Sequence, residues 1–242
     1  MFSVYLKEIK SFFSGIIGYL VIIVFFAING IFLWIVPETN IYATGYATLD
    51  QLFEIAPWVF LFLVPAITMR TFSEERKSGT FEILLTKPVN DLQLLLGKYF
   101  ASITLIAISI LPTLIYYYSV YHLAVPVGNV DSGGIWGSYI GLLLLGSSYA
   151  AIGIFTSVIT DNQIIAFIIS MLLSFFFYLL LDLLRGLIVI SPIDPVLEYL
   201  SINTHYISIS RGVLDSRDLL YFISFSALFI VIAKMIIEKR KW

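Results

Sequence analysis

The sequence predicts an all-helical integral membrane protein with six transmembrane helices. Of its 242 residues, 60% are apolar, against roughly 45–50% in an ordinary soluble domain, and 12% are charged, which is about half the usual share. The mean hydropathy is +0.97. A membrane helix takes about 20 residues, so a chain of this length holds six spans joined by short loops. This composition excludes a soluble enzyme, a nucleic-acid-binding domain and a disordered chain.

Six apolar segments are long enough to cross a bilayer. The first follows Lys7 and Lys10. It is too long for the core of a signal peptide, and no small-residue cleavage pattern follows it, so we expect a retained helix. Pro57, Pro65 and Pro112 lie inside the second and third segments and predict either static kinks or bending points. The expected spans are approximately 14–36, 52–69, 99–120, 135–160, 164–181 and 219–237.

The distribution of lysine and arginine predicts the orientation of the chain. With six spans, eleven of these residues fall on the side of the two termini and of loop 70–98, and three fall on the other side. Loops rich in Lys and Arg stay in the cytoplasm, so both termini are expected to be cytoplasmic. The formal net charge is only −2, which gives no reason to expect a nucleic-acid partner.

No catalytic constellation is recognisable in the sequence. His122 and His205 fall in different loops on the outer side, where we expect surface or interfacial positions. The pair Gly97-Lys98 lacks the following Ser or Thr and the preceding glycine of a phosphate-binding loop. Cysteine is absent, which excludes thiolate metal sites. We therefore expect no enzyme active site, metal or cofactor on this chain.

Ionisable residues are almost absent from the middle of the spans. A carrier driven by an ion gradient usually needs such residues at mid-membrane. Asp182 and Arg185 come nearest, at the outer end of the fifth span, and their spacing of three lets them pair on one helix face. They are interpreted as an interfacial ion pair, with a role in a substrate path as the alternative.

The loop 70–98 carries the longest charge-rich stretch of the chain. Residues 74–77 form a mixed-charge cluster that ends at the helix-breaking pair Ser78-Gly79. A short amphipathic piece follows at 80–86, and Pro88 ends it. The loop fits either a helix lying on the lipid surface or a docking element for a cytoplasmic partner.

Two stretches of this region match a known pattern. The first reads SEERKSGTFEILLTKPV from Ser73, and the second reads LLLGKYFA up to Ala101. Together they resemble the pattern E-x-x-x-G-T-x-E-x-L-L-x-x-P-V followed by G-K-x-x-A of ABC-2 type permeases, the membrane subunits of ATP-binding-cassette transporters. The stretch 211–222, RGVLDSRDLLYF, and the six-span layout extend the resemblance to nearly the whole chain. Within the family, the chain looks most similar to the gliding-motility permeases of Bacteroidetes.

The resemblance implies a fold, partners and site residues. The fold is a type V exporter-like architecture, with residues 1–242 as one permease domain and 182–218 as an external helical segment. Such permeases work in the bacterial inner membrane as homodimers or heterodimers, served by two separate ATPase subunits that bind ATP and magnesium. The loop between spans two and three then holds the coupling helix. The residues expected to form or flank the ATPase contact are Glu74, Glu75, Arg76, Gly79, Thr80 and Glu82.

Two other functions stay open at this point. A self-contained channel or carrier needs a polar lining, for which the spans supply only scattered Ser and Thr side chains. A structural anchor within a larger machine is the other possibility, with ATP used for assembly and not for transport. Gly137 and Gly141 form a small-xxx-small pair that favours close helix packing within the subunit over a dimer contact.

Overall fold

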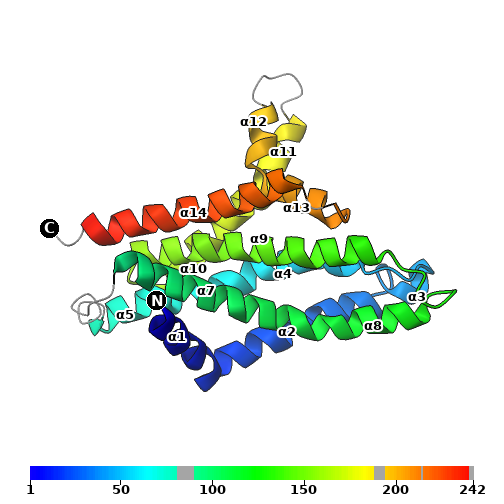
Figure 1. Cartoon of the computed structure of the whole chain (residues 1–242), viewed down its shortest axis with the longest axis horizontal. Helices are drawn as coiled ribbons and strands as arrows, with labels where there is room; N and C mark the ends of the chain where they lie inside the picture. Colours follow the sequence, from blue (N-terminus) through cyan, green and yellow to red (C-terminus); the bar gives the residue numbers. More distant parts are fainter. Residues whose placement is uncertain (81–89, 188–193, 214, 240–242) are drawn as a thin grey trace.

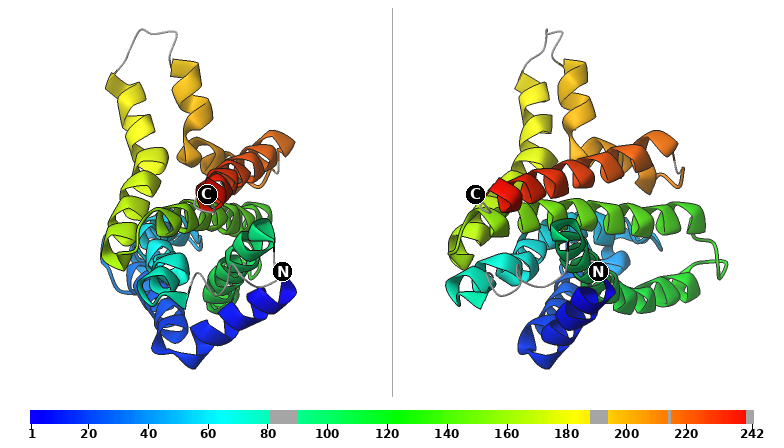
Figure 2. Two further views of the ribbon diagram at one scale, coloured as in Figure 1. Left: turned by 90° about the vertical axis from the view of Figure 1, so that its left-hand side faces the viewer. Right: turned by 60° about the vertical axis from the view of Figure 1, so that its left-hand side comes forward.

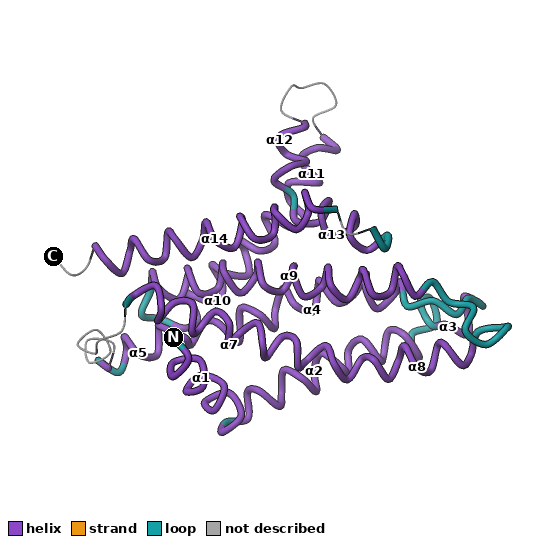
Figure 3. Tube along the Cα trace, in the orientation of Figure 1, coloured by secondary structure: helices purple, strands orange, loops and turns teal. Residues whose placement is uncertain are grey.

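A computed structural model describes residues 1–80, 90–187, 194–213 and 215–239. Over these ranges the chain consists of helices and loops, with no strand (Figure 3). Six helical stretches are long and apolar enough to cross a membrane, which confirms the predicted fold class. These stretches are Ile16–Trp34, Asp50–Lys77, Asp91–Leu123, Ser132–Ile159, Gln163–Arg185 and Ser216–Lys239.

Three of these stretches combine several helical segments, and the other three are single helices (Figure 1). The helices are α1 (Phe2–Ser14), α2 (Ile16–Trp34), α3 (Ile41–Thr44), α4 (Asp50–Thr68), α5 (Arg70–Lys77), α7 (Asp91–Ile110), α8 (Leu114–Leu123), α9 (Ser132–Ile159), α10 (Gln163–Phe175), α11 (Leu181–Leu187), α12 (Asp194–Leu200), α13 (Ile202–Ser210) and α14 (Ser216–Lys239). A 3-10 turn at Leu111–Thr113 joins α7 to α8, and a π-helical turn at Phe176–Leu180 joins α10 to α11.

Helix α9 is the centre of the bundle. It packs against α4, α7, α10, α13 and α14, and 72% of its most apolar window is buried, against 28% for α2 and for the stretch beginning with α10. The sequence of α9 explains this position, because its many Gly, Ala and Ser residues allow neighbouring helices to approach closely. Helices α2 and α10 lie at the periphery and leave apolar faces uncovered.

The glycines of α9 mark its closest contacts. A Cβ on Gly137 would lie 2.6 Å from the carbonyl oxygen of Ile209, and one on Gly141 would lie 3.3 Å from the Tyr206 ring. Both contacts are with α13 and its end, so this small-residue pair serves packing within the chain, as predicted. Farther along α9, a Cβ on Gly153 would lie 2.7 Å from the Cβ of Thr68 and would collide with its hydroxyl oxygen.

Helices α4 and α5 form one nearly continuous helical stretch, interrupted only around Met69. Pro57 and Pro65 both lie inside α4, which continues through them. Pro112, in contrast, lies in the 3-10 turn between α7 and α8. The charged start of loop 70–98 is therefore a helical extension of the second span, and Figure 1 shows α5 protruding at the end of the bundle.

Two elements depart from the direction of the bundle. The amphipathic helix α1 lies across the bundle axis and ends at Gly15, where α2 begins (Figure 2). At the other side, the helices α11 and α12 form a hairpin that projects away from the bundle (Figure 1). The N-terminus, α5 and the C-terminal end of α14 gather at one end of the bundle, which we call the α5 end.

Candidate functional site

Helix α5 is held against α9 by one serine. The hydroxyl oxygen of Ser157 accepts hydrogen bonds from the backbone N–H groups of Phe72, at 2.9 Å, and Ser73, at 3.1 Å. The same hydroxyl lies 3.1 Å from the carbonyl oxygen of Met69, to which it donates. The first N–H groups of a helix have no partner within the helix. Ser157 therefore caps α5 from a neighbouring helix and fixes where α5 begins.

Ser157→Ala is expected to lower the stability of the purified chain by about 1–3 kcal/mol, because it leaves buried backbone donors without their acceptor. The measurement is the melting temperature in detergent. Ser224→Ala is the matched control, since the Ser224 hydroxyl is exposed and bonds only to the Tyr221 carbonyl within its own helix. Equal melting temperatures for the two variants would show that Ser157 does not hold α5.

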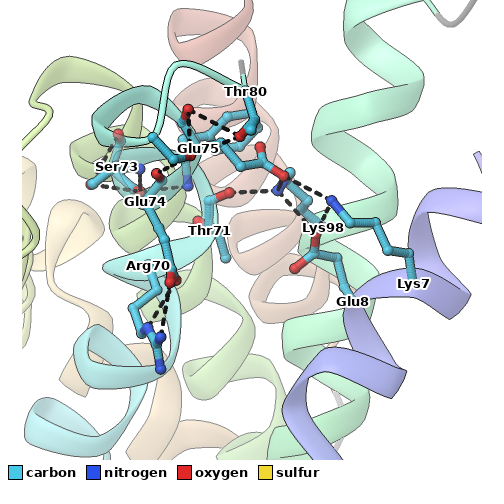
Figure 4. A network of polar contacts seen from close by, with 12 residues as sticks. Lys7, Glu8, Arg70, Thr71, Ser73, Glu74, Glu75, Thr80 and Lys98 are labelled. Atoms are coloured by element: carbon cyan, nitrogen blue, oxygen red, sulfur yellow. Dashed lines mark hydrogen bonds and ion pairs between the residues drawn. The ribbon is translucent and has the colours of Figure 1, made fainter. Parts of the chain in front are cut away.

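A buried ion network joins α5 to α1 and α7 (Figure 4). The Lys98 side chain of α7 is 1% exposed, and its ammonium nitrogen lies 3.0 Å from a carboxylate oxygen of Glu8 and 3.0 Å from one of Glu75. Lys98 donates hydrogen bonds to Glu8 and to the Thr71 carbonyl, and it forms an ion pair with Glu75. The network connects three helices that are far apart in the sequence.

Two further contacts complete this network. The Lys98 ammonium lies 4.8 Å from the centre of the Phe72 ring, a cation–π contact. Lys7 of α1 lies 3.0 Å from the Glu75 carboxylate. Burial lowers the pKa of Lys7, but the hydrogen bond and charge of Glu75 and the charge of Glu8 raise it overall above its usual value. Lys7 therefore stays protonated at neutral pH, and the network balances two ammonium groups with two carboxylates.

The predicted site residues divide between two faces of α5. Glu75 and Arg76 point inward, with side chains 13% and 4% exposed, and Arg76 lies 3.4 Å from the Asp161 carboxylate in the turn after α9. Glu74 points outward; its side chain is 50% exposed and pairs with Arg70 one turn earlier at 3.0 Å. Because of this division, Glu75 and Arg76 hold α5 in place, and Glu74 is available to a partner.

The end of α5 adds a small exposed surface. Lys77, Ser78, Gly79 and Thr80 are all exposed. Gly79 has a φ of 70°, in the left-handed region that favours glycine, and the chain turns away from the helix there. The hydroxyls of Ser78 and Thr80 lie 2.8 Å apart. Glu82, the last predicted contact residue, and the predicted amphipathic piece beyond Thr80 lie outside the described residues.

The predicted pair at the far side has a different geometry. Arg185 lies 4.0 Å from Asp182, at the limit of an ion pair, but its closer partners are Asp194 at 3.0 Å and Glu198 at 3.1 Å, both on α12. Asp182 accepts a hydrogen bond from Asn203 of α13 at 2.8 Å. These contacts hold the α11–α12 hairpin together and join it to α13.

The expectation for the histidines is wrong for His205. His122 is exposed, but His205 is buried, 2.6 Å from the Asp218 carboxylate and 3.2 Å from the Tyr199 carbonyl oxygen. Its ring stacks on Tyr221 at 3.8 Å between centres. Asp218 lies in the first turn of α14 and faces α13, an arrangement that sequence spacing alone does not disclose.

Sequence reasoning also missed Glu8 and Lys98. One usable signal was that Lys98 is the last charge before the long uncharged run 99–130, so it lies at the start of a span, where a charge needs a partner. A second was the amphipathic pattern of residues 2–14 before Gly15, which marks a separate helix. Within the described residues, no group of three or more His, Asp or Glu side chains could hold a metal ion.

A comparison with protein families finds a match that covers most of the chain. Residues 35–233 match a family described as ABC-2 family transporter protein. No curated protein matches the chain. The matched range includes α5, the Ser157 contact and Lys98, and it contains four complete spans and most of the last one. The chain belongs to the ABC-2 family of transporter proteins.

Proposed function

We propose that this membrane permease subunit couples ATP hydrolysis on a separate ABC ATPase to export, or to a gliding-motility or secretion machine. In this proposal the chain lies in a bacterial inner membrane with both termini in the cytoplasm. The sequence supports that orientation, because eleven of its 14 lysines and arginines fall on the predicted side of the two termini and of loop 70–98. ATP and magnesium bind the partner, and α5 is the coupling helix.

The observation that best supports this proposal is the length of the α4–α5 stretch and its bonds to the neighbouring helices. Its 28 residues extend about 42 Å at 1.5 Å per residue, which exceeds the roughly 30 Å hydrocarbon core of a bilayer. At least one end of the stretch therefore stands beyond the membrane, and in this proposal it is the charged α5 end. Because α5 continues α4 and is bonded to α1, α7 and α9, a displacement of α5 moves several helices together. A loose loop could not transmit such a displacement.

The surface offered to the ATPase consists of Glu74 and the exposed end of α5, residues 77–80. Glu75 and Arg76 support this surface from within. The uncovered faces of α2 and α10 also support a second permease, either a copy of this chain or a different one, as the remaining partner. Interfaces of this kind between membrane helices depend on packing of exposed apolar faces.

Glu74→Lys tests the coupling surface. We expect it to lower the ATPase rate of the assembled complex by about tenfold, because it reverses a charge at the docking surface. The melting temperature should change by less than about 2 °C, because Glu74 is a surface residue. Glu238→Lys is a closely matched control: Glu238 is 48% exposed and pairs with Lys234 one turn earlier, as Glu74 does with Arg70.

The outcomes separate the candidate functions. An unchanged ATPase rate in the Glu74→Lys complex would contradict the role of this surface. Solute flux in liposomes containing this chain without any ATPase would favour a self-contained channel or carrier. A complex that binds and uses ATP for its assembly without transporting anything would favour a structural anchor. The proposal first requires that an ATPase co-purifies with this chain when the chain is extracted from its native membrane in mild detergent.

A further inference from the structure

A pocket of about 570 Å³ opens at the end of the bundle opposite α5. It lies between the first turns of α4, the π-helical turn and α13. Asp50, Glu54 and Trp58 line it from α4 at intervals of four residues, which places them on one helix face. Tyr178 lines it from the π-helical turn, a distortion that is frequent at functional sites.

Two carboxylates line this pocket. Asp50 and Glu54 are exposed and lie one helical turn apart. Neither forms an ion pair or accepts a side-chain hydrogen bond among residues 1–80, 90–187, 194–213 and 215–239. Like charges at this spacing repel each other. A positively charged ligand would remove that repulsion.

The remaining walls of the pocket combine four aromatic residues with polar and aliphatic ones, which are Ser138, Leu179, Asn203, Ile207 and Ser210. The rings of Trp58 and Tyr178 meet edge to face with centres 5.8 Å apart. Tyr178 is only 6% exposed, and within the described chain its hydroxyl has no hydrogen-bond partner. The hydroxyl of Tyr206, in contrast, is already bonded to the Phe53 carbonyl oxygen at 2.8 Å. Tyr178 therefore presents an unused hydroxyl in a nearly buried position on the pocket wall.

We propose that this pocket binds an organic ammonium group. Aromatic faces attract ammonium ions, and carboxylates add a full opposite charge. A divalent metal ion fits less well, because the described residues offer no cluster of three ligating side chains. The ligand comes either from an aminophospholipid headgroup or from a soluble polyamine or quaternary amine. The site does not depend on coupling to an ATPase, so the proposed function can fail without affecting it.

The test uses the full chain in nanodiscs of phosphatidylglycerol, which has no amino group. Calorimetric titration compares choline and spermidine with 3,3-dimethylbutan-1-ol, an uncharged analogue of choline. We expect both cations to bind and the uncharged analogue to bind at least about tenfold more weakly. Equal binding of choline and its analogue, or no binding of either cation, would overturn the proposal.

Variants assign the binding to this pocket. Asp50→Asn combined with Glu54→Gln should weaken choline binding by about tenfold or more, and Trp58→Leu should weaken it independently. Glu38→Gln removes an exposed carboxylate at the same end of the bundle, outside the pocket, and should leave binding unchanged. Unchanged binding in the double variant would refute the site. All these side chains are at the surface, so folding is not at risk.

The lipid composition then identifies the source of the ammonium group. Replacing part of the phosphatidylglycerol with phosphatidylethanolamine lowers the apparent affinity for choline if a lipid headgroup occupies the pocket. An unchanged affinity assigns the pocket to a soluble cation. Both results retain the ammonium site and differ only in its natural ligand.

Discussion

Lys98→Met is expected to destabilise the purified chain by about 3 kcal/mol, because it removes the buried cation between Glu8 and Glu75 and leaves these carboxylates with only the more exposed Lys7. For a chain of this size, that loss corresponds to a fall of at least about 6 °C in the melting temperature. Methionine retains much of the volume and apolar character of the lysine stem, so the effect reports mainly on the charge. Thermal unfolding in detergent measures it.

Two further variants isolate the cause. Lys10→Met removes an exposed lysine from α1 and should leave the melting temperature nearly unchanged. Adding Glu8→Gln and Glu75→Gln to Lys98→Met should recover part of the loss, because neutral amides cost less to bury than unpaired carboxylates. If Lys98→Met melted like the unmodified chain, the network would not hold α1, α5 and α7 together.

Gly153→Val is the second substitution expected to have a large effect. A Cβ at this position already overlaps the Thr68 side chain, and valine adds two more carbons. We expect α4 to be forced away from α9 at a cost of about 1–3 kcal/mol or more. The contact lies one turn from the start of α5, so the same substitution should also impair coupling to the ATPase.

The matched control for this substitution is on the same helix. A Cβ on Gly133 has its nearest neighbour at 3.5 Å, an ordinary contact, so Gly133→Val should be tolerated better. Gly153→Ala alone should also lower the stability. Adding Thr68→Gly, which removes the side chain that the new Cβ would meet, should restore part of that loss. Equal melting temperatures for Gly153→Val and Gly133→Val would contradict the close approach of α4 and α9.

The six-span layout was predictable, because a long uncharged run in lipid must form a helix to satisfy its own backbone hydrogen bonds. The structure of the α5 end was harder to predict from the sequence. Charges begin at Arg70, which indicates the start of a loop, yet the helix continues to Lys77 because Ser157, far along the chain, caps it. Helix α7 begins after Asn90, a residue type that often caps helices, but the Asn90 side chain makes no capping hydrogen bond.

The candidate site was predictable as a segment, but not in its detail. The resemblance places Glu74, Glu75 and Arg76 together in one motif, and only the packing separates them. The pairing of Glu75 with Lys98 and Glu8 depends on tertiary contacts between residues 23 to 90 positions apart. Consequently, reversing the charge at both Glu74 and Glu75 would change the folding and the docking surface at once, and the two effects could not be separated. Glu74 alone is the informative position.

The coupling role of α5 is tested most directly by crosslinking. The chain has no cysteine, so a single cysteine reports on one position. Lys77→Cys places it at the exposed end of α5, and Tyr46→Cys places it in an exposed position at the opposite end of the bundle. In membranes containing the ATPase, a short bifunctional reagent should crosslink the Lys77→Cys chain to the ATPase and leave the Tyr46→Cys chain free. A crosslink from Tyr46→Cys, or none from Lys77→Cys in an active complex, would contradict the account.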